Sequence, residues 1–538
     1  MYEVFFAQQR DGQRGGKGAN YYKITSRASK PKPFSSFIAE SILIRSTDKL
    51  RDLLQVIIDF HDLGKYTSYF QDYLLQRDTV DHKLKQHSRF GGYAAYHFLK
   101  GKDEKTALIA LYIIFHHHLQ LIDIDEIAYK INSESQRVFE EQVKGLGSAL
   151  EVIANELDIQ NIEELLQFPD EQKIRKQARI WVRREQDISD YFLINYLFSL
   201  LIEADKLDAS KTSLYPLKEI DSNWVDKRFG APDLPGFQNL EGLSNNELRN
   251  YCRAEVVSHL QDDDILDQHL FTLTAPTGIG KTMTALDFSL KLKAKLRSEK
   301  EHEAQIIYAL PFINIIEQAI DEYEITLTEK EIRILGHYQF ADVFGLQQDS
   351  DDETDNYHQK LMKLDTWQSD VVITSFVQFF ETVISNRNKL LKKFNHLAGS
   401  IVILDEVQTL RLDQMPLIGA TLYYLARFLD ARIIMMTATR AQIFELAEQE
   451  ILDDEGESIE SKELLSSHEQ VFSLLERTAI HSLLDSLPSE DEKSVQFAEE
   501  IFEPRWQTDK SCLIVCNTVN RSIEVYEEIK NYLEERYD

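Results

Sequence analysis

The sequence predicts a multidomain protein in which an all-α domain precedes an α/β domain built on a parallel sheet. The chain has 538 residues, a length typical of about three or four domains. Up to about residue 222, apolar residues recur at helical spacing, as in the segment LRDLLQVIIDF at 50–60. From Phe271 onward, short β-rich runs alternate with helical segments, which is typical of a parallel sheet with crossover helices.

Changes in composition along the chain predict four parts. We expect an all-α domain over 1–222, a linker over 223–245, an α/β lobe over 246–445, and an acidic hinge followed by a last strand–helix pair over 446–538. The linker is expected because this region contains prolines and glycines and little apolar periodicity. The expected strands lie at 271–276, 305–311, 370–376, 400–406 and 431–439, with a last strand–helix pair at 511–530.

Charge, cysteine content and hydropathy exclude several classes of protein. The net charge of −30 argues against a protein coated in nucleic acid, although a local basic channel remains compatible with it. Three cysteines imply no disulfide framework or zinc ribbon, and a reducing cytoplasm fits them. The longest apolar stretch, Tyr191 to Ile202, is too short to span a bilayer, and the N-terminal segment lacks a secretory signal pattern. We therefore expect a cytoplasmic protein without a membrane partner.

The segment TAPTGIGKT at Thr274 to Thr282 predicts a phosphate-binding loop, because it follows an apolar strand and opens a helix. Backbone N–H groups would wrap the phosphates of Mg-ATP, Lys281 would reach the β- and γ-phosphates, and Thr282 would hold Mg²⁺. The expected ATP contacts in this loop are Thr277, Gly278, Gly280, Lys281 and Thr282.

The segment IVILDEVQ at 401–408 predicts the second half of the same site. Asp405 at the end of a buried strand can coordinate Mg²⁺ through water, and Glu406 can polarise the water that attacks the γ-phosphate. Thr437 and Thr439 end another strand, where they could sense the γ-phosphate and couple its loss to motion.

These segments, in this order, resemble the first RecA-like lobe of superfamily 2 helicases. The segments at 309–318 and 371–387 resemble the motifs with which that family grips nucleic-acid phosphates. The residues that match this pattern are Pro311, Thr374, Ser375 and Gln378. The DEVQ box and the segment VQFFE are similar to those of the CRISPR-associated helicase–nucleases of type I systems, which carry an HD nuclease domain before the helicase lobes.

The helical domain supplies side chains suited to such a metal centre. His61 continues the buried stripe of its helix and is followed by Asp62, and imidazole with carboxylate suits Mn, Fe, Co or Ni. The metal ligands that the resemblance implies are His61, Asp62, His87, His116, His117 and Asp205. The register within His116 to His118 stays open by one residue, whereas His82, His97 and His118 are expected as ordinary structural histidines. Since no histidine precedes His61, one or two metal ions are possible.

Two further residues near this centre carry expectations from their spacing. Lys65 lies one turn after His61, where it could meet a substrate phosphate. Gly91 lies four residues after His87, and a small residue there would allow another helix to approach closely.

The resemblance implies an ATP-dependent 3′-to-5′ DNA helicase with a metal-dependent nuclease that degrades foreign single-stranded DNA in CRISPR interference. Its partners would be single-stranded DNA and the RNA-guided surveillance complex, and its expected state is a monomer. The expected catalytic residues are Asp62, Lys65 and Glu406.

The segment VCNTVNRS at 515–522 resembles the first nucleic-acid motif of the second RecA-like lobe, so 446–538 would be a hinge and the incomplete start of that lobe. In the family this lobe contributes an arginine that speeds ATP hydrolysis, and no arginine-rich motif follows here. We therefore expect this polypeptide, as a fragment or split gene product, to bind ATP better than it hydrolyses it.

Two alternatives remain open from the sequence. The first is an HD phosphohydrolase that acts on nucleotides and is regulated by an ATPase lobe. The second is a truncated ATP-binding DNA clamp without catalysis.

Overall fold

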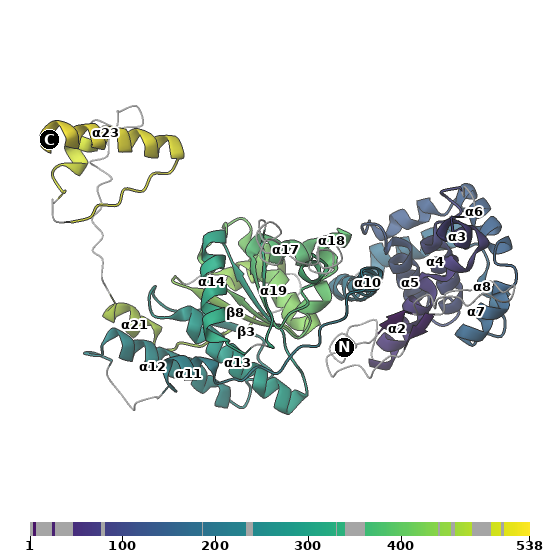
Figure 1. Cartoon of the computed structure of the whole chain (residues 1–538), viewed down its shortest axis with the longest axis horizontal. Helices are drawn as coiled ribbons and strands as arrows, with labels where there is room; N and C mark the ends of the chain where they lie inside the picture. Colours follow the sequence, from purple (N-terminus) through teal and green to yellow (C-terminus); the bar gives the residue numbers. More distant parts are fainter. Residues whose placement is uncertain are drawn as a thin grey trace. The chain divides into compact units, whose positions relative to one another are not determined.

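The computed structural model divides into two compact units, residues 1–474 and 475–538. It describes residues 4–6, 24–26, 47–76, 81–185, 187–232, 240–329, 331–338, 361–439, 442–452, 458–475, 497–506 and 510–537. The first unit contains a helical N-terminal region and an α/β lobe with a parallel sheet (Figure 1).

The N-terminal region is helical apart from one small antiparallel ribbon, β1 (Val4–Phe6) with β2 (Ile24–Ser26). The first part of the helical set is α2 (Thr47–His61), η1 (Leu63–Tyr66), α3 (Ser68–Leu74), α4 (His87–Leu99), α5 (Glu104–His116) and η2 (Ile124–Lys130). The second part is α6 (Ser133–Lys144), α7 (Ala149–Leu157), α8 (Ile162–Leu165), α9 (Glu171–Ile180), η3 (Trp181–Glu185) and α10 (Ile188–Ala209).

Helices α2 and α4 cross at a glycine. A Cβ atom on Gly91 would lie 2.0 Å from the backbone oxygen of Phe60, so the backbones touch where Gly91 has no side chain. A Cβ on Gly64 would likewise lie 2.6 Å from the Cα atom of His87. The prediction of a close approach at Gly91 is therefore confirmed, and this contact brings the end of α2 to the start of α4.

The α/β lobe is built on a seven-stranded sheet with the order β5-β6-β4-β7-β8-β3-β9, whose paired strands are all parallel. Its strands are β3 (Leu270–Thr274), β4 (Ile306–Leu310), β5 (Ile334–His337), β6 (Val371–Ser375), β7 (Ile401–Leu404), β8 (Arg432–Thr437) and β9 (Lys462–Glu463). Five of them are the strands predicted for this lobe. The sequence analysis missed β5, which is short and contains Gly336, and β9, which has two residues.

Helices flank and connect these strands (Figure 1). Those before and between the first strands are α11 (Trp224–Phe229), α12 (Asn245–Ser258), η4 (His259–Gln261), α13 (Lys281–Lys300) and α14 (Ile313–Thr326). Those after β6 are α17 (Phe376–Ile384), α18 (Asn388–Leu391), η5 (Phe394–Leu397), η6 (Val407–Thr409), α19 (Met415–Leu429), α20 (Ile443–Ala447), η7 (Glu448–Leu452) and α21 (His468–Leu474).

One hydrophobic core joins the helical region to the sheet. It contains Phe198 and Leu201 of α10 together with Ile307, Val402 and Ile433, which lie side by side on one face of the sheet. A helix that is apolar on nearly all sides is stable when most of its surface is covered, and most of α10 is buried by packing between α5 and α19.

The second unit differs from its prediction. Its described elements are η10 (Phe497–Phe502) and α23 (Val519–Tyr537). The strand expected before α23 is wrong, because residues 510–518 form no strand with any described residue. A strand requires a neighbour to complete its backbone hydrogen bonds, and Leu513 and Val515 are instead 87% and 85% exposed.

No helix within the described ranges is long and apolar enough to cross a membrane.

The crossing of α2 and α4 leads to a stability prediction. Gly91→Ala should lower the free energy of unfolding by about 1–3 kcal/mol or more, because the new methyl group meets backbone atoms that cannot rotate away. Thermal and urea unfolding followed by circular dichroism would measure this loss. Gly101→Ala is the matched control, because a Cβ there meets nothing within 4 Å. Equal stability of the two variants would contradict the close crossing.

Candidate functional site

A group of histidines and one aspartate gathers where three helices of the N-terminal region meet. His61 ends α2 and Asp62 follows it, His87 begins α4, and His117 and His118 follow α5. Asp62 lies between two of the imidazoles, since its carboxylate oxygens are 3.4 Å from Nε2 of His61 and 3.3 Å from Nε2 of His87. Nε2 of His118 lies 2.9 Å from Nε2 of His87.

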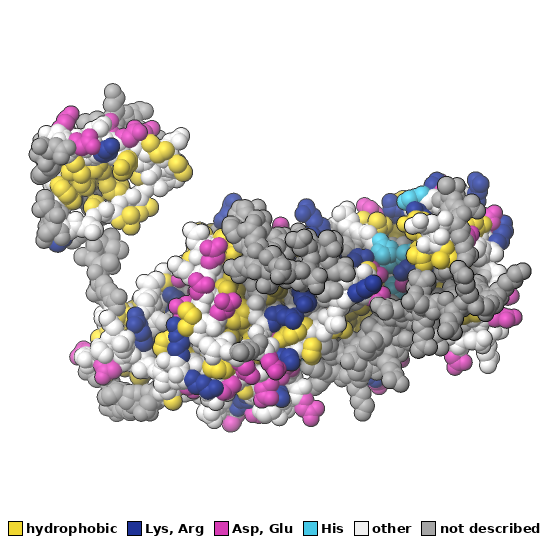
Figure 2. All heavy atoms as spheres, in the orientation of Figure 1, with side chains coloured by type: hydrophobic (Ala, Val, Ile, Leu, Met, Phe, Trp, Pro, Cys, Tyr) yellow, Lys and Arg dark blue, Asp and Glu magenta, His cyan; other side chains and the backbone are white. Residues whose placement is uncertain are grey.

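Ligand atoms of His87, His117 and His118 lie within 4.8 Å of one another, a spacing at which one metal ion could be held. The ring of His117 lies 5.5 Å from the rings of both His61 and His87. His117 is buried whereas His118 is exposed, so the group opens to solvent on one side. Figure 2 shows histidine side chains at the surface of the helical region.

The hydrogen bonds of His61 and His117 place the lone pair of each ring on Nε2, from which a metal ion could be held. Nδ1 of His61 contacts the Ile58 carbonyl at 2.6 Å, and Nδ1 of His117 contacts the Ile114 carbonyl at 2.7 Å. An N–H on Nδ1 would donate in each case, which assigns the lone pair to Nε2, as in metal-binding histidines. Nε2 of His117 and Oδ1 of Asp62 are buried and make no hydrogen bond with the described residues. Such atoms fit a bound cation, because burying them unsatisfied is costly.

Burial and neighbouring charges set the protonation states that a metal would require. Burial lowers the pKa of His87 to about 3 and lowers the pKa of His117 well below its ordinary value. Burial alone would raise the pKa of Asp62, but the neighbouring His61, Lys65 and His87, whose protonated forms attract the carboxylate, lower it below its ordinary value. Neutral imidazoles and an ionised carboxylate are the forms that ligate metals.

Lys65 and Asp205 lie at the edge of this group. Nζ of Lys65 is 2.6 Å from Oδ2 of Asp62, and its side chain remains 28% exposed. Asp205, near the end of α10, pairs with Lys206 at 2.6 Å and interacts electrostatically with His118 and Asp62.

His116 is not among the residues that the structure brings together, which corrects its inclusion in the predicted ligand set. Its Nδ1 contacts the Tyr112 carbonyl one turn earlier, and the charges near it are those of Arg89 and Lys130. His118, expected to be an ordinary structural histidine, lies in the group instead. The helix ends at His116, so the following turn, rather than the helical face, directs His117 and His118.

The phosphate-binding loop lies between β3 and α13. Gly278 and Gly280 have φ angles of +84° and +88°, which glycine adopts without strain. Nζ of Lys281 lies 3.1 Å from the Ala275 carbonyl and 3.9 Å from Oε1 of Glu406. Thr277 is exposed at the tip of the loop. Lys281 therefore spans the interior of the loop, where phosphates would lie.

Two residues of this site were missed by the sequence analysis because they lie outside its motifs. The Tyr308 hydroxyl donates to Oδ2 of Asp405 at 2.7 Å and also contacts the Thr282 side chain. Nε of Arg249, on α12, donates to the Gly278 carbonyl at 2.9 Å. Burial raises the pKa of Asp405, and the Tyr308 hydrogen bond opposes that rise.

A chain of contacts links the acidic segment to the threonine segment. Glu406 has a left-handed φ of +55°, an unusual angle for a residue with a side chain. Nε2 of Gln408 donates to Glu406, and the Thr437 hydroxyl donates to Oε1 of Gln408 at 2.8 Å. The backbone N–H of Thr439 donates to the Thr437 hydroxyl oxygen at 3.0 Å. Gln408 thus joins the segments that were predicted separately.

The predicted nucleic-acid contacts lie around the start of α17, with one correction. Thr374 is fully buried and its hydroxyl donates to the His337 carbonyl at 2.7 Å, so this hydroxyl is not available to a phosphate. Ser375 caps α17, and its hydroxyl oxygen accepts from the Gln378 backbone at 3.2 Å. Ser375, Gln378 and Pro311 are partly exposed.

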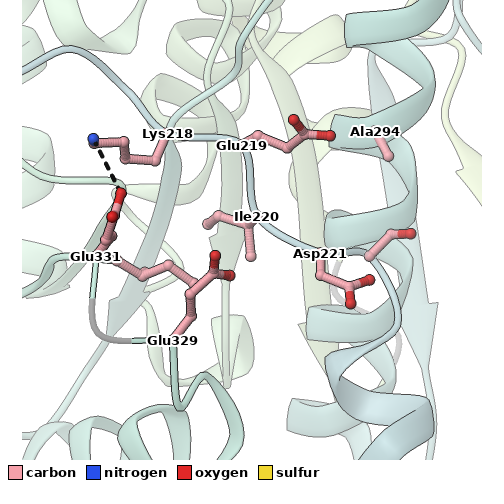
Figure 3. Close-up of a pocket in the computed structure, with 9 residues that line it drawn as sticks. Lys218, Glu219, Ile220, Asp221, Ala294, Glu329 and Glu331 are labelled. Atoms are coloured by element: carbon pink, nitrogen blue, oxygen red, sulfur yellow. Dashed lines mark hydrogen bonds and ion pairs between the residues drawn. The ribbon is translucent and has the colours of Figure 1, made fainter.

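A separate cavity of about 450 Å³ lies beside α13. Figure 3 shows that Glu219, Asp221, Glu329 and Glu331 line it and that Lys218 pairs with Glu331. The Lys218 Nζ atom lies 3.5 Å from Oε2 of Glu331. Four carboxylates repel a polyphosphate, so this cavity is not suited to ATP or DNA.

Comparisons with known proteins agree with the helicase-like motifs. Residues 253–446 match the family model described as DEAD/DEAH box helicase. The chain is 26% identical, over 456 residues, to a CRISPR-associated nuclease/helicase Cas3 from Haloferax volcanii; the match covers 77% of this chain and 48% of that relative. The chain therefore spans about half the length of this curated relative.

Two solved structures are also similar. The crystal structure of T. fusca Cas3 matches with a TM-score of 0.48 and 14% identity, covering 80% of this chain and 48% of that chain. A structure described as a CRISPR RNA-guided surveillance complex, pre-nicking, matches with a TM-score of 0.40 and 16% identity, covering 80% of this chain and 46% of that chain. Residues 253–446 thus match a DEAD/DEAH box helicase domain, and the chain as a whole is similar to a CRISPR-associated nuclease/helicase Cas3.

Proposed function

We propose that this chain combines a metal-dependent nuclease for single-stranded DNA with the first lobe of an ATP-dependent 3′-to-5′ DNA helicase, and that it acts in type I CRISPR interference. In this proposal residues 1–222 form the HD nuclease domain, 223–245 the linker, and 246–445 most of the first helicase lobe. The sheet of this lobe continues to β9, so the start of the second lobe lies after residue 474, beyond the predicted boundary at 446. The partners are single-stranded DNA and an RNA-guided surveillance complex.

The observation that carries the nuclease proposal is the convergence of His61, Asp62, His87, His117 and His118 from three segments, with buried atoms left for a cation. These residues would hold one or two ions of Mn, Fe, Co or Ni, with Asp205 as a further carboxylate donor. When bound, such a metal supplies Lewis acidity and a water of lowered pKa.

Residues in and around the histidine group would position the metal ligands and the DNA phosphate. Asp62, held between His61 and His87, fixes the relative positions of two ligand-bearing helices. Lys65, paired with Asp62 but partly exposed, can neutralise a DNA phosphate that enters from solvent. Exposure of His118 leaves one side of the group open to a polymer.

The helicase proposal rests on the contacts of the phosphate-binding loop. Lys281 would pair with the β- and γ-phosphates of Mg-ATP, while Thr282 and Asp405 flank the position expected for Mg²⁺. Glu406 would activate water, and Gln408 would transmit the γ-phosphate state to Thr437 and Thr439. Ser375, Gln378 and Pro311 would contact the DNA backbone.

The histidine register gives a direct test of the metal centre. Replacing His117 or His118 with glutamine should weaken Mn²⁺ binding at least tenfold, because each removes an imidazole from the group. Isothermal titration calorimetry with MnCl₂ measures the dissociation constant. His116→Gln is the matched control and should change it less than threefold. If only the His116 variant lost Mn²⁺, our assignment of the ligand group would be overturned.

The substrate class follows from a nuclease assay. With Mn²⁺ or Ni²⁺, the protein should degrade circular single-stranded DNA. Asp62→Asn should reduce the rate at least 100-fold, because the carboxylate between His61 and His87 loses its charge. Gel electrophoresis of the DNA measures this. Release of phosphate from free nucleotides with intact DNA would instead indicate a nucleotide phosphohydrolase, and binding of DNA without cleavage of either substrate would indicate a clamp.

The two sites should be separable by mutation. Lys281→Ala should weaken ATP binding at least tenfold because it removes the cation that meets the phosphates, while cleavage of single-stranded DNA should persist. Binding of a fluorescent ATP analogue and the circular-DNA assay measure the two properties. Lys295→Ala, on the same helix and paired with Glu299, is the control. Loss of DNA cleavage with Lys281→Ala would contradict independent sites.

A further inference from the structure

The loop that carries two histidines of the metal group is attached to the helicase lobe. We call residues 117–121, which follow α5, the histidine loop. Nδ2 of Asn388 donates to the His117 carbonyl at 2.8 Å. At the other end of the loop, Asn386 forms two hydrogen bonds with Leu121: its side-chain Nδ2 donates to the Leu121 carbonyl at 3.0 Å, and its backbone carbonyl accepts from the Leu121 N–H at 2.9 Å.

We call these two asparagines the asparagine clamp: Asn386 lies between α17 and α18, and Asn388 is the first residue of α18. The clamp therefore follows directly after the helix that Ser375 caps and that carries Gln378, the predicted DNA contacts. Three hydrogen bonds bind both ends of the histidine loop to a part of the chain more than 260 residues away in sequence.

The histidine loop forms neither helix nor strand, and its internal turn consists of the bond from the Leu119 N–H to the His116 carbonyl at 2.7 Å. His117 and Leu121 at its two ends are buried, and its other backbone hydrogen bonds to the rest of the chain include those of the two asparagines. A cavity of about 800 Å³ lies beside the clamp, lined in part by Leu121, Tyr191 and Asn386. The hydrogen bonds of the clamp therefore join the loop to the lobe at the edge of this open space, beside the buried side chain of Leu121.

The clamp holds His117, a histidine whose ring must face the metal group. The His117 ring is fixed by its Nδ1 contact with the Ile114 carbonyl, and the His117 carbonyl is fixed by Asn388. Together they set the direction of Nε2, the buried atom that makes no hydrogen bond with the described residues. A change at the carbonyl would rotate the peptide that joins His117 to His118.

We propose that Asn386 and Asn388 are positioning residues through which the helicase lobe sets the metal affinity of the histidine group. This inference rests on the proposed metal centre. It assigns to the helicase lobe a second task beyond ATP and DNA binding, namely to complete the geometry of a site in the other domain. Residues in the second layer around a metal commonly change its affinity by 10- to 100-fold.

Other contacts across the same boundary do not reach the loop and provide a control. The Tyr191 hydroxyl donates to the Val383 carbonyl, only three residues before Asn386. Tyr191→Phe therefore removes one hydrogen bond from the same boundary while leaving the histidine loop attached. If the asparagines only joined the two domains, Tyr191→Phe and the clamp variants would change Mn²⁺ binding equally.

The test measures Mn²⁺ binding by isothermal titration calorimetry on the full chain. Asn388→Asp, which keeps the side-chain shape but loses the donor, should weaken Mn²⁺ binding about tenfold or more. Asn388→Ala and Asn386→Ala should also weaken it, Asn388→Gln should restore part of it, and Tyr191→Phe should change it less than threefold. Circular dichroism confirms that each variant is folded, and Asn386→Ala replaces Asn388→Asp if the latter is not.

DNA cleavage provides a second measurement. In titrations with Mn²⁺, the clamp variants should need about tenfold more metal for half-maximal cleavage but reach a similar rate at saturation, because the ligands themselves remain. Absence of Mn²⁺ binding by the unaltered protein would overturn the proposed metal centre and this inference with it. Normal binding by the unaltered protein together with unchanged binding by folded clamp variants, or an equal loss in Tyr191→Phe, would overturn the inference alone.

Discussion

Burial of most of α10 between the helical region and the α/β lobe is the constraint on which the first unit depends. The helix has 22 residues and packs against the helical region on one side and against α19 of the α/β lobe on the other. Since an apolar helix exposed on either side would be unfavourable, the two regions are held to a common core. The order of the sheet continues that core, because alternate residues of β4, β7 and β8 lie on the face that shares it.

The polar residues of α10 are satisfied by the neighbouring lobe. The Ser199 hydroxyl oxygen accepts from the Asn395 backbone at 2.9 Å, and the buried Glu203 carboxylate accepts from side chains of Gln368 and Asn395 and contacts His396. A buried carboxylate is costly unless it is hydrogen-bonded, so these partners fix the lobe at one register along the helix. Asp205 lies half a turn beyond Glu203, at the edge of the histidine group, and α10 thereby relates that group to the sheet.

Local patterns predicted much of the fold and part of the site. Apolar stripes and β-rich runs predicted α2 and five strands, because the spacing of apolar residues within one segment depends only on which face of that segment is buried. The pair His61 and Asp62 and the close approach at Gly91 were visible for the same reason. His116 stays outside the histidine group and His118 lies in it, because a turn after α5 directs His117 and His118 and no helical period describes a turn. Tyr308, Arg249 and the asparagine clamp became apparent only in three dimensions, since each acts on a residue distant in sequence.

The shared core also constrains how such a chain can change during evolution. Two domains joined by a flexible tether can be exchanged or separated between genes with little cost to either. Here α10 belongs to both interiors, so a break between the helical region and the sheet would expose apolar surface on each product. Recombination in this lineage should therefore keep residues 188–209 together with their neighbours in α19. Rearrangements should occur at boundaries that do not cut through a hydrophobic core.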